Sequence, residues 1–117
     1  MNPGARTPEE LDELLEDAFV VRDGTQLSAL FEDCGILALT PAGREVCGSE
    51  AIGKAAASLW TRDRTYVAKA PRVLRARDTA LLLSEAGIHV ARRGRDKEWR
   101  LMICVLADGN PITKENQ

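Results

Sequence analysis

The chain holds few of the residues on which catalytic and metal sites usually depend. Its 117 residues include one histidine, one tyrosine, two tryptophans, two phenylalanines and three cysteines. One histidine and three scattered cysteines offer no metal-ligand spacing such as Cys-x-x-Cys, so we expect no metal site. Glycine-rich phosphate loops do not occur either, and the sequence therefore predicts no nucleotide or other cofactor.

Long apolar runs are also missing. No stretch approaches the roughly 18–20 apolar residues that cross a bilayer, and residues 1–6 lack the apolar core of a secretory signal. Cys34, Cys47 and Cys104 are odd in number and have apolar neighbours. This pattern favours reduced cysteines in the core of a cytoplasmic protein over a disulfide, and we expect no membrane partner.

Basic residues are scarce in the first half of the chain and concentrated in the second. Residues 1–61 carry 11 acidic and 4 basic side chains, whereas residues 62–117 carry 7 acidic and 12 basic ones. Nucleic-acid-binding faces combine clustered Lys and Arg with aromatic residues that stack on bases. Several arginines here alternate with acids, as in Arg62-Asp63-Arg64, and aromatic residues are few. We therefore expect no nucleic-acid partner.

The N-terminal part predicts two helices. The first begins at Thr7, because Thr7 can cap it, Pro8 suits the first helical position and Glu10 completes a capping box. The acids of residues 9–13 also suit the positive end of the helix dipole. Gly24 is expected to end this helix in a left-handed conformation, and Thr25 to cap a second, short helix.

The remaining segments predict a third helix and a set of strands. Ser49 can cap the helix. Pro71 removes a ladder donor, so its strand is expected to be bulged or at a sheet edge. About twenty residues separate Asp78 from Trp99, which leaves room for two short strands or one bent strand. The expected helix covers residues 49–60, and the expected strand segments are residues 34–39, 45–47, 66–77, 80–86, 88–91 and 99–106.

The last predicted strand is apolar on both faces. Because side chains alternate along a strand, each face receives every second residue. The two expected faces are Trp99, Leu101, Ile103 and Val105, and Met102, Cys104 and Leu106. One face meets the helices, and a second subunit packed sheet to sheet is the simplest cover for the other. We therefore expect a homodimer through the sheet face, with a sheet that curls over itself as the alternative.

Three local patterns occur in a consistent order. Arg22-Asp23-Gly24-Thr25 lies between two helices, Gly48-Ser49-Glu50-Ala51-Ile52 opens the third helix, and a turn precedes Glu98-Trp99-Arg100. With this order of elements, residues 7–107 resemble the nuclear transport factor 2-like superfamily, which includes the ketosteroid isomerases and SnoaL-like polyketide cyclases. The resemblance implies a single domain over residues 1–117. It also implies a cone-shaped, cystatin-like α+β fold, in which three N-terminal helices pack on a curved, mostly antiparallel mixed sheet around an apolar pocket.

The resemblance does not decide the chemistry. Ketosteroid isomerases use a tyrosine on the first helix, an aspartate base on the first strand and a further acid. These positions fall at Leu15, Leu39 and near Ile88, and an aliphatic side chain can neither accept a proton from carbon nor stabilise an enolate. Since the fold supports many functions, the sequence leaves open whether the protein is an enzyme.

His89 and Glu85 are the candidate catalytic residues. The ordinary pKa of histidine suits proton transfer near neutral pH, and Glu85 shares the face of His89 if the strand is regular. Gly87 lies between them and can break that alternation with a bulge or a turn. A histidine whose ring bonds the backbone is the alternative interpretation.

The predicted ligand pocket combines residues from the helices and the sheet. Its expected lining is Leu15, Phe19, Leu39, Trp60, Tyr66, His89 and Met102. We accordingly expect a homodimer that binds a small apolar ligand with no settled reaction. The alternatives are an isomerase, cyclase or dehydratase acting on a polyketide- or steroid-like substrate, and a protein–protein interaction module whose cavity is filled by its own side chains.

Overall fold

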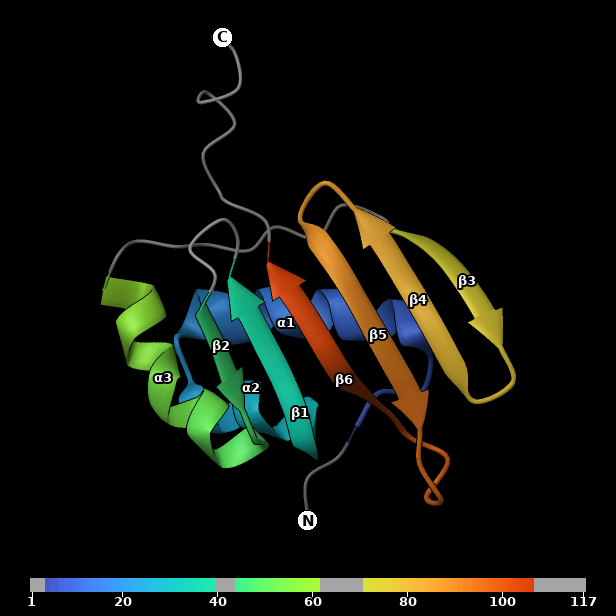
Figure 1. The fold of residues 1–117 in the computed structure, drawn as a ribbon, viewed down its shortest axis with the longest axis horizontal. Coiled ribbons are helices and arrows are strands. Elements are labelled where there is room, and N and C mark those ends of the chain that lie inside the picture. Colours follow the sequence, from blue (N-terminus) through green and yellow to red (C-terminus); the bar gives the residue numbers. More distant parts are fainter. Residues whose placement is uncertain (1–3, 40–43, 62–70, 107–117) are drawn as a thin grey trace, which may run out of the picture.

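The structure is a computed structural model that describes residues 4–39, 44–61 and 71–106, with the side chains of residues 39, 44 and 56–61 left aside. This part of the chain forms three helices and one six-stranded sheet (Figure 1). The helices are α1 (Pro8–Val21), α2 (Gly24–Ala29) and α3 (Ser49–Thr61). The strands are β1 (Phe31–Leu39), β2 (Arg44–Cys47), β3 (Arg72–Ala76), β4 (Thr79–Ser84), β5 (Gly87–Arg93) and β6 (Trp99–Leu106).

The sheet is mixed, as predicted. Its strand order is β2-β1-β6-β5-β4-β3, and every neighbouring pair is antiparallel except β1 and β6, which are parallel. Two strands, β4 and β5, occupy the segment between Asp78 and Trp99. The α+β class is therefore confirmed. The helices do not form one N-terminal block of three, because α3 follows the β1–β2 hairpin.

Local capping explains where α1 begins. Thr7 is the N-cap, and its hydroxyl oxygen accepts a hydrogen bond from the Glu10 N–H at 3.2 Å. The Glu10 carboxylate accepts a second bond from the N–H of Arg6 at 2.7 Å. Pro8 occupies the first turn, where its missing N–H costs nothing. The predicted start of the helix is confirmed.

The junction between α1 and α2 differs from the prediction by two residues. Arg22, with a φ of 54°, takes the left-handed position that ends α1, where we expected Gly24. Asp23 caps α2, and its carboxylate accepts from the N–H groups of Thr25 and Gln26. A carboxylate caps a helix better than a threonine hydroxyl, so the short helix begins earlier than the sequence pattern indicated.

The core lies between α1 and one face of the sheet. In Figure 1, α1 crosses behind the strands, and it packs against β4 and β6. The helix contributes Leu11, Leu15, Ala18 and Phe19, and the sheet contributes Leu37, Ala80, Leu82, Ala91, Trp99, Leu101, Cys104 and Leu106. We call the face that carries these side chains the inner sheet face.

A β-bulge changes which side chains of β6 reach the inner sheet face. The pairing of β6 with β5 skips Met102, which is the extra residue. A bulge shifts the alternation of side chains by one residue. The buried residues of β6 are Trp99, Leu101, Cys104 and Leu106. Ile103 and Val105, which we expected beside Trp99, face the opposite side, so this prediction was wrong beyond the bulge.

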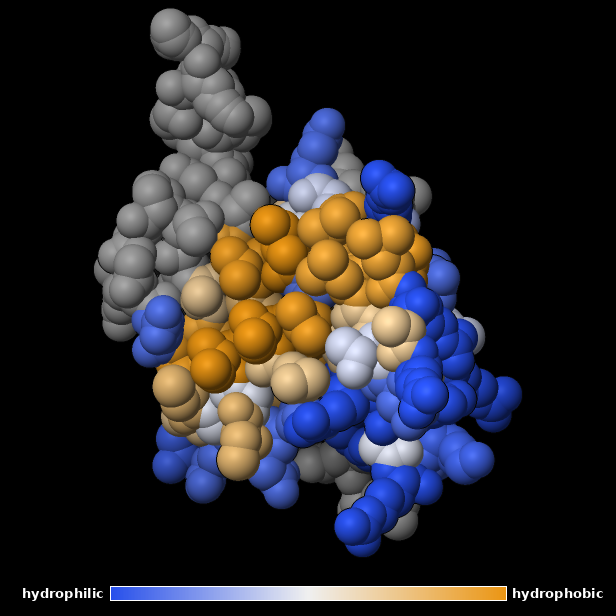
Figure 2. All heavy atoms as spheres, turned by 45° about the vertical axis from the view of Figure 1, so that its right-hand side comes forward, coloured by the Kyte–Doolittle hydropathy of each residue, from blue (hydrophilic) through white to orange (hydrophobic). Residues whose placement is uncertain are grey.

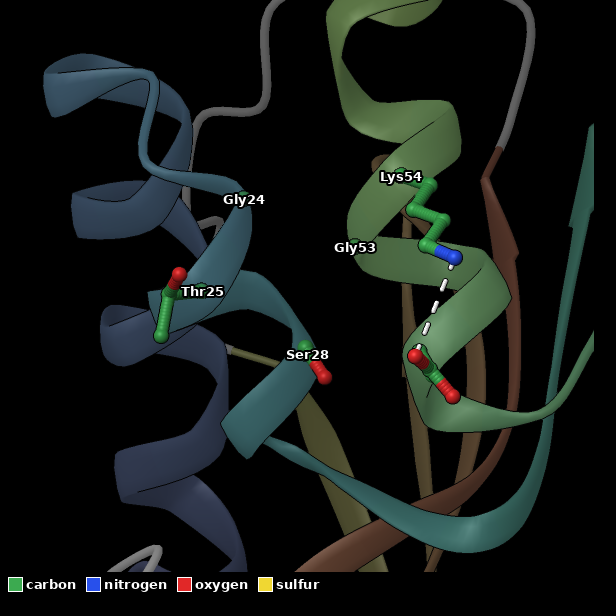
Figure 3. Close-up of a pocket in the computed structure, with 6 residues that line it drawn as sticks. Gly24, Thr25, Ser28, Gly53 and Lys54 are labelled. Carbon is green, nitrogen blue, oxygen red and sulfur yellow. Dashed lines mark ion pairs between the residues drawn. The ribbon is translucent and has the colours of Figure 1, made fainter.

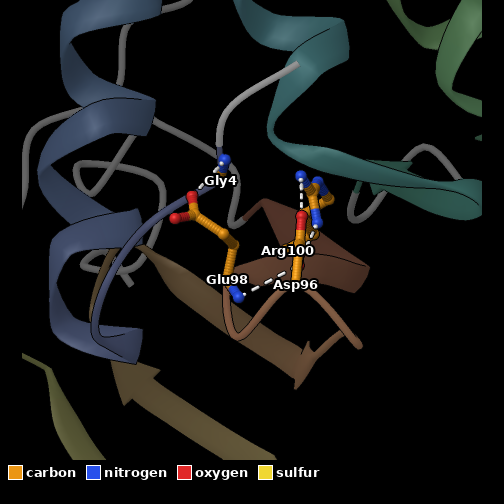
Figure 4. Close-up of polar contacts among 4 residues, drawn as sticks. All are labelled: Gly4, Asp96, Glu98 and Arg100. Atoms are coloured by element: carbon orange, nitrogen blue, oxygen red, sulfur yellow. Dashed lines mark hydrogen bonds and ion pairs between the residues drawn. The ribbon is translucent and has the colours of Figure 1, made fainter. Parts of the chain in front are cut away.

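The start of the described chain is tied to the beginning of β6. Ala5 and Trp99 exchange two backbone hydrogen bonds, of 2.9 and 2.7 Å. The N–H of Gly4 donates to the Glu98 carboxylate at 2.8 Å (Figure 4). Asp96, in the turn before β6, pairs with Arg100 of β6 at 2.9 Å. These contacts fix the entry of the chain into α1 relative to the sheet.

The three cysteines are free, and they occupy different environments. Cys104 is buried, as predicted, whereas Cys34 and Cys47 are exposed. Next to Cys34 on β1, the buried positions are Gly35 and Leu37, so Cys34 points away from the core. The prediction of a core position was therefore wrong for Cys34 and Cys47.

Candidate functional site

Two ionisable side chains lie in the apolar interior between α1 and the sheet. Asp12 comes from α1 and His89 from β5, and each is only 2% exposed. In the sheet, His89 is paired with Leu82 on β4 and with Cys104 on β6, and both of these are fully buried. The charge of Asp12 raises the pKa of His89, so the two groups lie within electrostatic reach across the interior. We call Asp12, His89 and Cys104 the interior polar cluster.

Helical and strand periodicity place the members of this cluster. The buried stripe of α1 is Pro8, Leu11, Asp12, Leu15, Ala18 and Phe19. Asp12 therefore lies at helical spacing among aliphatic residues and must face the sheet. On β5, Gly87, His89 and Ala91 are the buried residues, and the imidazole is the longest side chain among them.

The interior strongly affects how His89 and Cys104 titrate. Burial lowers the pKa of the His89 imidazole below its ordinary 6.5, although the charge of Asp12 and a hydrogen bond with the backbone of Ile88 act in the opposite direction. Burial, and to a smaller extent the charge of Asp12, raises the pKa of the Cys104 thiol well above its usual range. At neutral pH the cluster therefore holds a neutral imidazole and an unreactive thiol.

Acidification is expected to destabilise the protein through His89. Because its folded-state pKa lies below 6.5, the unfolded chain binds a proton more readily. The contribution of His89 to stability is therefore complete above pH 6.5 and is lost as the pH falls through 6.5 toward the folded-state pKa. Urea unfolding between about pH 8 and about pH 5 should show a slope of at most about 1.4 kcal/mol per pH unit, the value for one proton.

A His89→Gln variant is the matched control for this pH dependence. Asp12 is the acid that faces His89 from α1, and β4 and β6 present Leu82 and Cys104. The variant should therefore lack the loss of stability near pH 6.5 and keep the loss from carboxylates at lower pH. Equal losses in the two proteins over this range would assign the effect to another group.

The structure describes the positions of several predicted site residues. Leu15 and Phe19 of α1 and His89 of β5 are buried between the helix and the sheet. Met102 is half-buried at the bulge, and Glu85 lies in the exposed turn between β4 and β5. Glu85 and His89 therefore do not share a face. The side chains of Leu39 and Trp60, and all of Tyr66, lie outside the described residues.

The structure also revises the comparison with the isomerase positions. Ile88, where we expected the further acid to be replaced by an aliphatic residue, points away from the interior and is 48% exposed. The neighbouring His89 is the residue that enters the interior. Sequence reasoning missed Asp12, although an acid inside the apolar stripe of the first helix was a signal that could have identified it.

The opposite side of the sheet carries an extended apolar surface. Strand register aligns its side chains in two rows: Leu74, Leu81, Val90, Ile103 and Ile36, and Leu83, Ile88, Val105 and Ala38. We call these nine residues the outer sheet face. Figure 2 shows apolar side chains gathered in one continuous patch, with hydrophilic side chains below it and on its right-hand side. At its margin, Arg92 pairs with Glu32 at 2.8 Å.

A separate groove lies between α2 and α3 (Figure 3). It has a volume of about 360 Å³ and is lined by Gly24, Thr25, Ser28, Glu50, Gly53 and Lys54. Glu50 and Lys54 form an ion pair at 3.7 Å, and both are largely exposed. The groove lies at the surface and contains none of the predicted site residues.

Neither a metal-binding cluster nor a membrane-spanning helix occurs in the part of the chain that the structure describes. Among the described residues, no group of three or more His, Cys, Asp or Glu side chains is arranged to hold a metal ion. In the same part of the chain, every helix is too short or too polar to span a membrane.

The similarity of this chain to known proteins is a similarity of structure. No protein-family model matches the chain, and no curated protein matches it. An NTF2-like protein with a cystatin-like fold from Novosphingobium aromaticivorans superimposes with a TM-score of 0.68 at 19% identity, covering 89% of this chain and 82% of that chain. The chain has the nuclear transport factor 2-like fold.

Two further solved structures match most of the chain. A ketosteroid isomerase-like protein from Erwinia carotovora atroseptica has a TM-score of 0.66 at 15% identity, covering 88% of this chain and 94% of that chain. ActVI-ORFA from Streptomyces coelicolor has a TM-score of 0.61 at 16% identity, covering 83% of this chain and 90% of that chain. Because the fold hosts many activities, function must be argued from the interior and the surface.

Proposed function

We propose that this protein binds a small apolar ligand in the interior of its nuclear transport factor 2-like fold, as a homodimer. The pair of Asp12 and His89 is the observation that carries the ligand proposal. Burying ionisable groups costs free energy unless partners compensate it. Small-molecule sites are typically apolar regions with a few converging polar groups. The pair supports a ligand that is mostly apolar and carries one polar group.

The surroundings of the pair support the same ligand chemistry. Leu11 and Leu15 flank Asp12 on α1, and Leu82 lies beside His89 on the sheet. These side chains offer dispersion contacts and no hydrogen bonds. A ligand in contact with them gains from burial of its own apolar surface, and among the described residues the interior polar cluster offers partners for its polar group. This division of roles favours one orientation of the ligand.

The outer sheet face supports the homodimer. Leu74 is 46% exposed and Ile88 is 48% exposed, and their neighbours on adjacent strands are aliphatic. Continuous apolar patches of this kind mark interaction sites. A second copy of the same face fits best, because a two-fold axis brings identical aliphatic rows together and leaves the charged margin in water. A different protein partner on this face is the competing interpretation.

A thermal-shift screen tests the ligand proposal. The protein is melted with steroids, polyketide-like aromatics, terpenes and fatty acids. A compound that binds only the folded state, at about 100 times its dissociation constant, should add about 2.7 kcal/mol to stability. The shift should shrink in His89→Gln and persist in Glu13→Gln, which changes an exposed carboxylate beside Asp12. No shift with any of these classes would favour an interaction module with a self-filled interior.

A further inference from the structure

We propose that Cys34 and Cys47 form a redox-sensitive dithiol pair, which a low-molecular-weight disulfide such as glutathione disulfide converts into a labile disulfide bond. Both cysteines are free and exposed, whereas Cys104, the third cysteine of the chain, is buried. Neither exposed cysteine belongs to the interior polar cluster or to the outer sheet face as defined above. The inference therefore goes beyond the proposed function and does not depend on it.

Strand register brings the two cysteines to one side of adjacent strands. Cys47 of β2 is paired with Ile36 of β1, and directly paired residues project to the same side of a sheet. Cys34 precedes Ile36 by two residues, and the residues that alternate with them, at positions 35 and 37, are buried. Cys34 and Cys47 are therefore diagonal neighbours on the outward side of the β1–β2 pair.

The expected separation of the two cysteines is close to the reach of a disulfide bond. Diagonal neighbours on antiparallel strands have Cα atoms roughly 7–8 Å apart, with Cβ atoms somewhat closer. A disulfide bond usually joins Cα atoms that are at most about 6.8 Å apart. Bond formation therefore requires the two strands to shift by about 1 Å. A bond formed in this way retains strain, and strained or exposed disulfides are the readily reduced ones.

The backbone beside the cysteines can accommodate this shift. Each exposed cysteine precedes a glycine, and the N–H of Gly48 donates to the carbonyl oxygen of Gly35 at 2.7 Å. Gly48 has a φ of 98°, a conformation that other residues rarely adopt. Among the described strands, β2 pairs with β1 alone and lies at the edge of the sheet (Figure 1). A shift of β2 therefore strains one ladder in this part of the sheet.

The shift would be passed on to α3. This helix begins at Ser49, two residues after Cys47, and the carbonyl oxygen of Gly48 accepts a hydrogen bond from the N–H of Ile52 at 2.9 Å. The first turn of α3 also carries Glu50, which lines the groove between α2 and α3. The reduced and oxidised forms should therefore differ in β2 and in the first turn of α3.

Thiol–disulfide exchange supplies the chemistry. The thiolate of one cysteine attacks a sulfur of glutathione disulfide, which gives a mixed disulfide and releases one glutathione. The thiolate of the other cysteine then attacks the protein sulfur of the mixed disulfide and releases the second glutathione. The protein dithiol is thereby oxidised to a disulfide, one glutathione disulfide is reduced to two glutathiones, and the two thiol protons pass to the released thiolates.

The test incubates the folded protein with glutathione disulfide and then measures its free thiols and its mass. We expect the loss of two of the three thiols, a mass lower by two hydrogen atoms, and a pair of proteolytic fragments that joins Cys34 to Cys47. Excess reduced glutathione should restore all three thiols. Retention of all three thiols, a covalent dimer, or a bond that includes Cys104 would overturn the proposal, as would an internal bond that glutathione does not reduce.

A double variant that moves the thiol along β2 is the matched control. Glu45 is exposed and pairs with Ala38, so Cys47→Ser/Glu45→Cys places the thiol on the same side of β2 but two residues farther from Cys34. We expect this variant to gain glutathione adducts and to form no internal bond. An internal bond in equal yield in both proteins would show that strand register does not select the pair, and the proposal would then be wrong.

Discussion

Replacing Ile88 and Val90 together with lysine is expected to make the protein monomeric at micromolar concentration. Both residues point outward from β5, with aliphatic residues of β4 and β6 on either side. A two-fold interface contains every substitution twice, so several ammonium groups would lose water inside one apolar contact. We expect the dissociation constant to rise at least about a thousandfold, or about 4 kcal/mol, in sedimentation velocity measurements.

A Thr79→Lys variant is the control for this experiment. Thr79 is exposed at the end of β4 and pairs with Arg92 at the charged margin of the outer sheet face. Its lysine would remain in water, so the association should match that of the wild type. Circular dichroism should show unchanged secondary structure in all variants, because none replaces a core residue. A monomeric wild-type protein, or a dimeric Ile88→Lys/Val90→Lys protein, would show that the proposed interface is wrong.

Replacing Trp99 with alanine is expected to lower the free energy of unfolding by about 3–5 kcal/mol, as for other large aromatic residues in cores. Trp99 is 1% exposed. The guanidinium carbons of Arg75 and Arg93 lie 4.9 and 5.7 Å from the centroid of its ring. Because small domains are stable by only about 5–15 kcal/mol, the variant should unfold at much lower urea concentration.

An Arg75→Ala variant separates packing from the cation–π contact. Arg75 is exposed, and its removal should cost only about 0.5–1 kcal/mol, the usual value for such a contact at the surface. A Trp99→Phe variant should fall between the two, because it keeps an aromatic ring but leaves a cavity. If Trp99→Ala were as stable as Arg75→Ala, the indole would not be a core anchor.

Much of the fold could be predicted because it depends on short-range sequence signals, namely helix caps and the spacing of apolar residues. Thr7, Pro8 and Glu10 define the start of α1, and the order of helices and strands follows from periodicity. The faces of β6 could not be predicted in the same way. The bulge at Met102 depends on how β6 pairs with β5, and no local pattern records that pairing. One extra residue then reverses every side chain that follows it.

The interior site was half predictable for a similar reason. His89 was found because it is the one imidazole in the chain. Asp12 was overlooked because an acid near the start of a helix is equally explained by the helix dipole. The place of Asp12 in the interior site follows from the packing of α1 on the sheet and from the burial of His89 on β5. That relation joins residues 77 positions apart in the chain and appears only when the strand order is known.

The central position of β6 has a consequence for synthesis on the ribosome. β6 lies between β1 and β5, and among the described strands it is the one that joins the β2–β1 pair to the β5–β4–β3 group. A nascent chain emerges from its N-terminus, so neither group can close the core before residues 99–106 have left the exit tunnel. Until then the edges of β1 and β5 offer unpaired backbone groups to other chains. We therefore expect folding to await release of β6, and a nascent chain that stalls before Trp99 to keep these strand edges exposed.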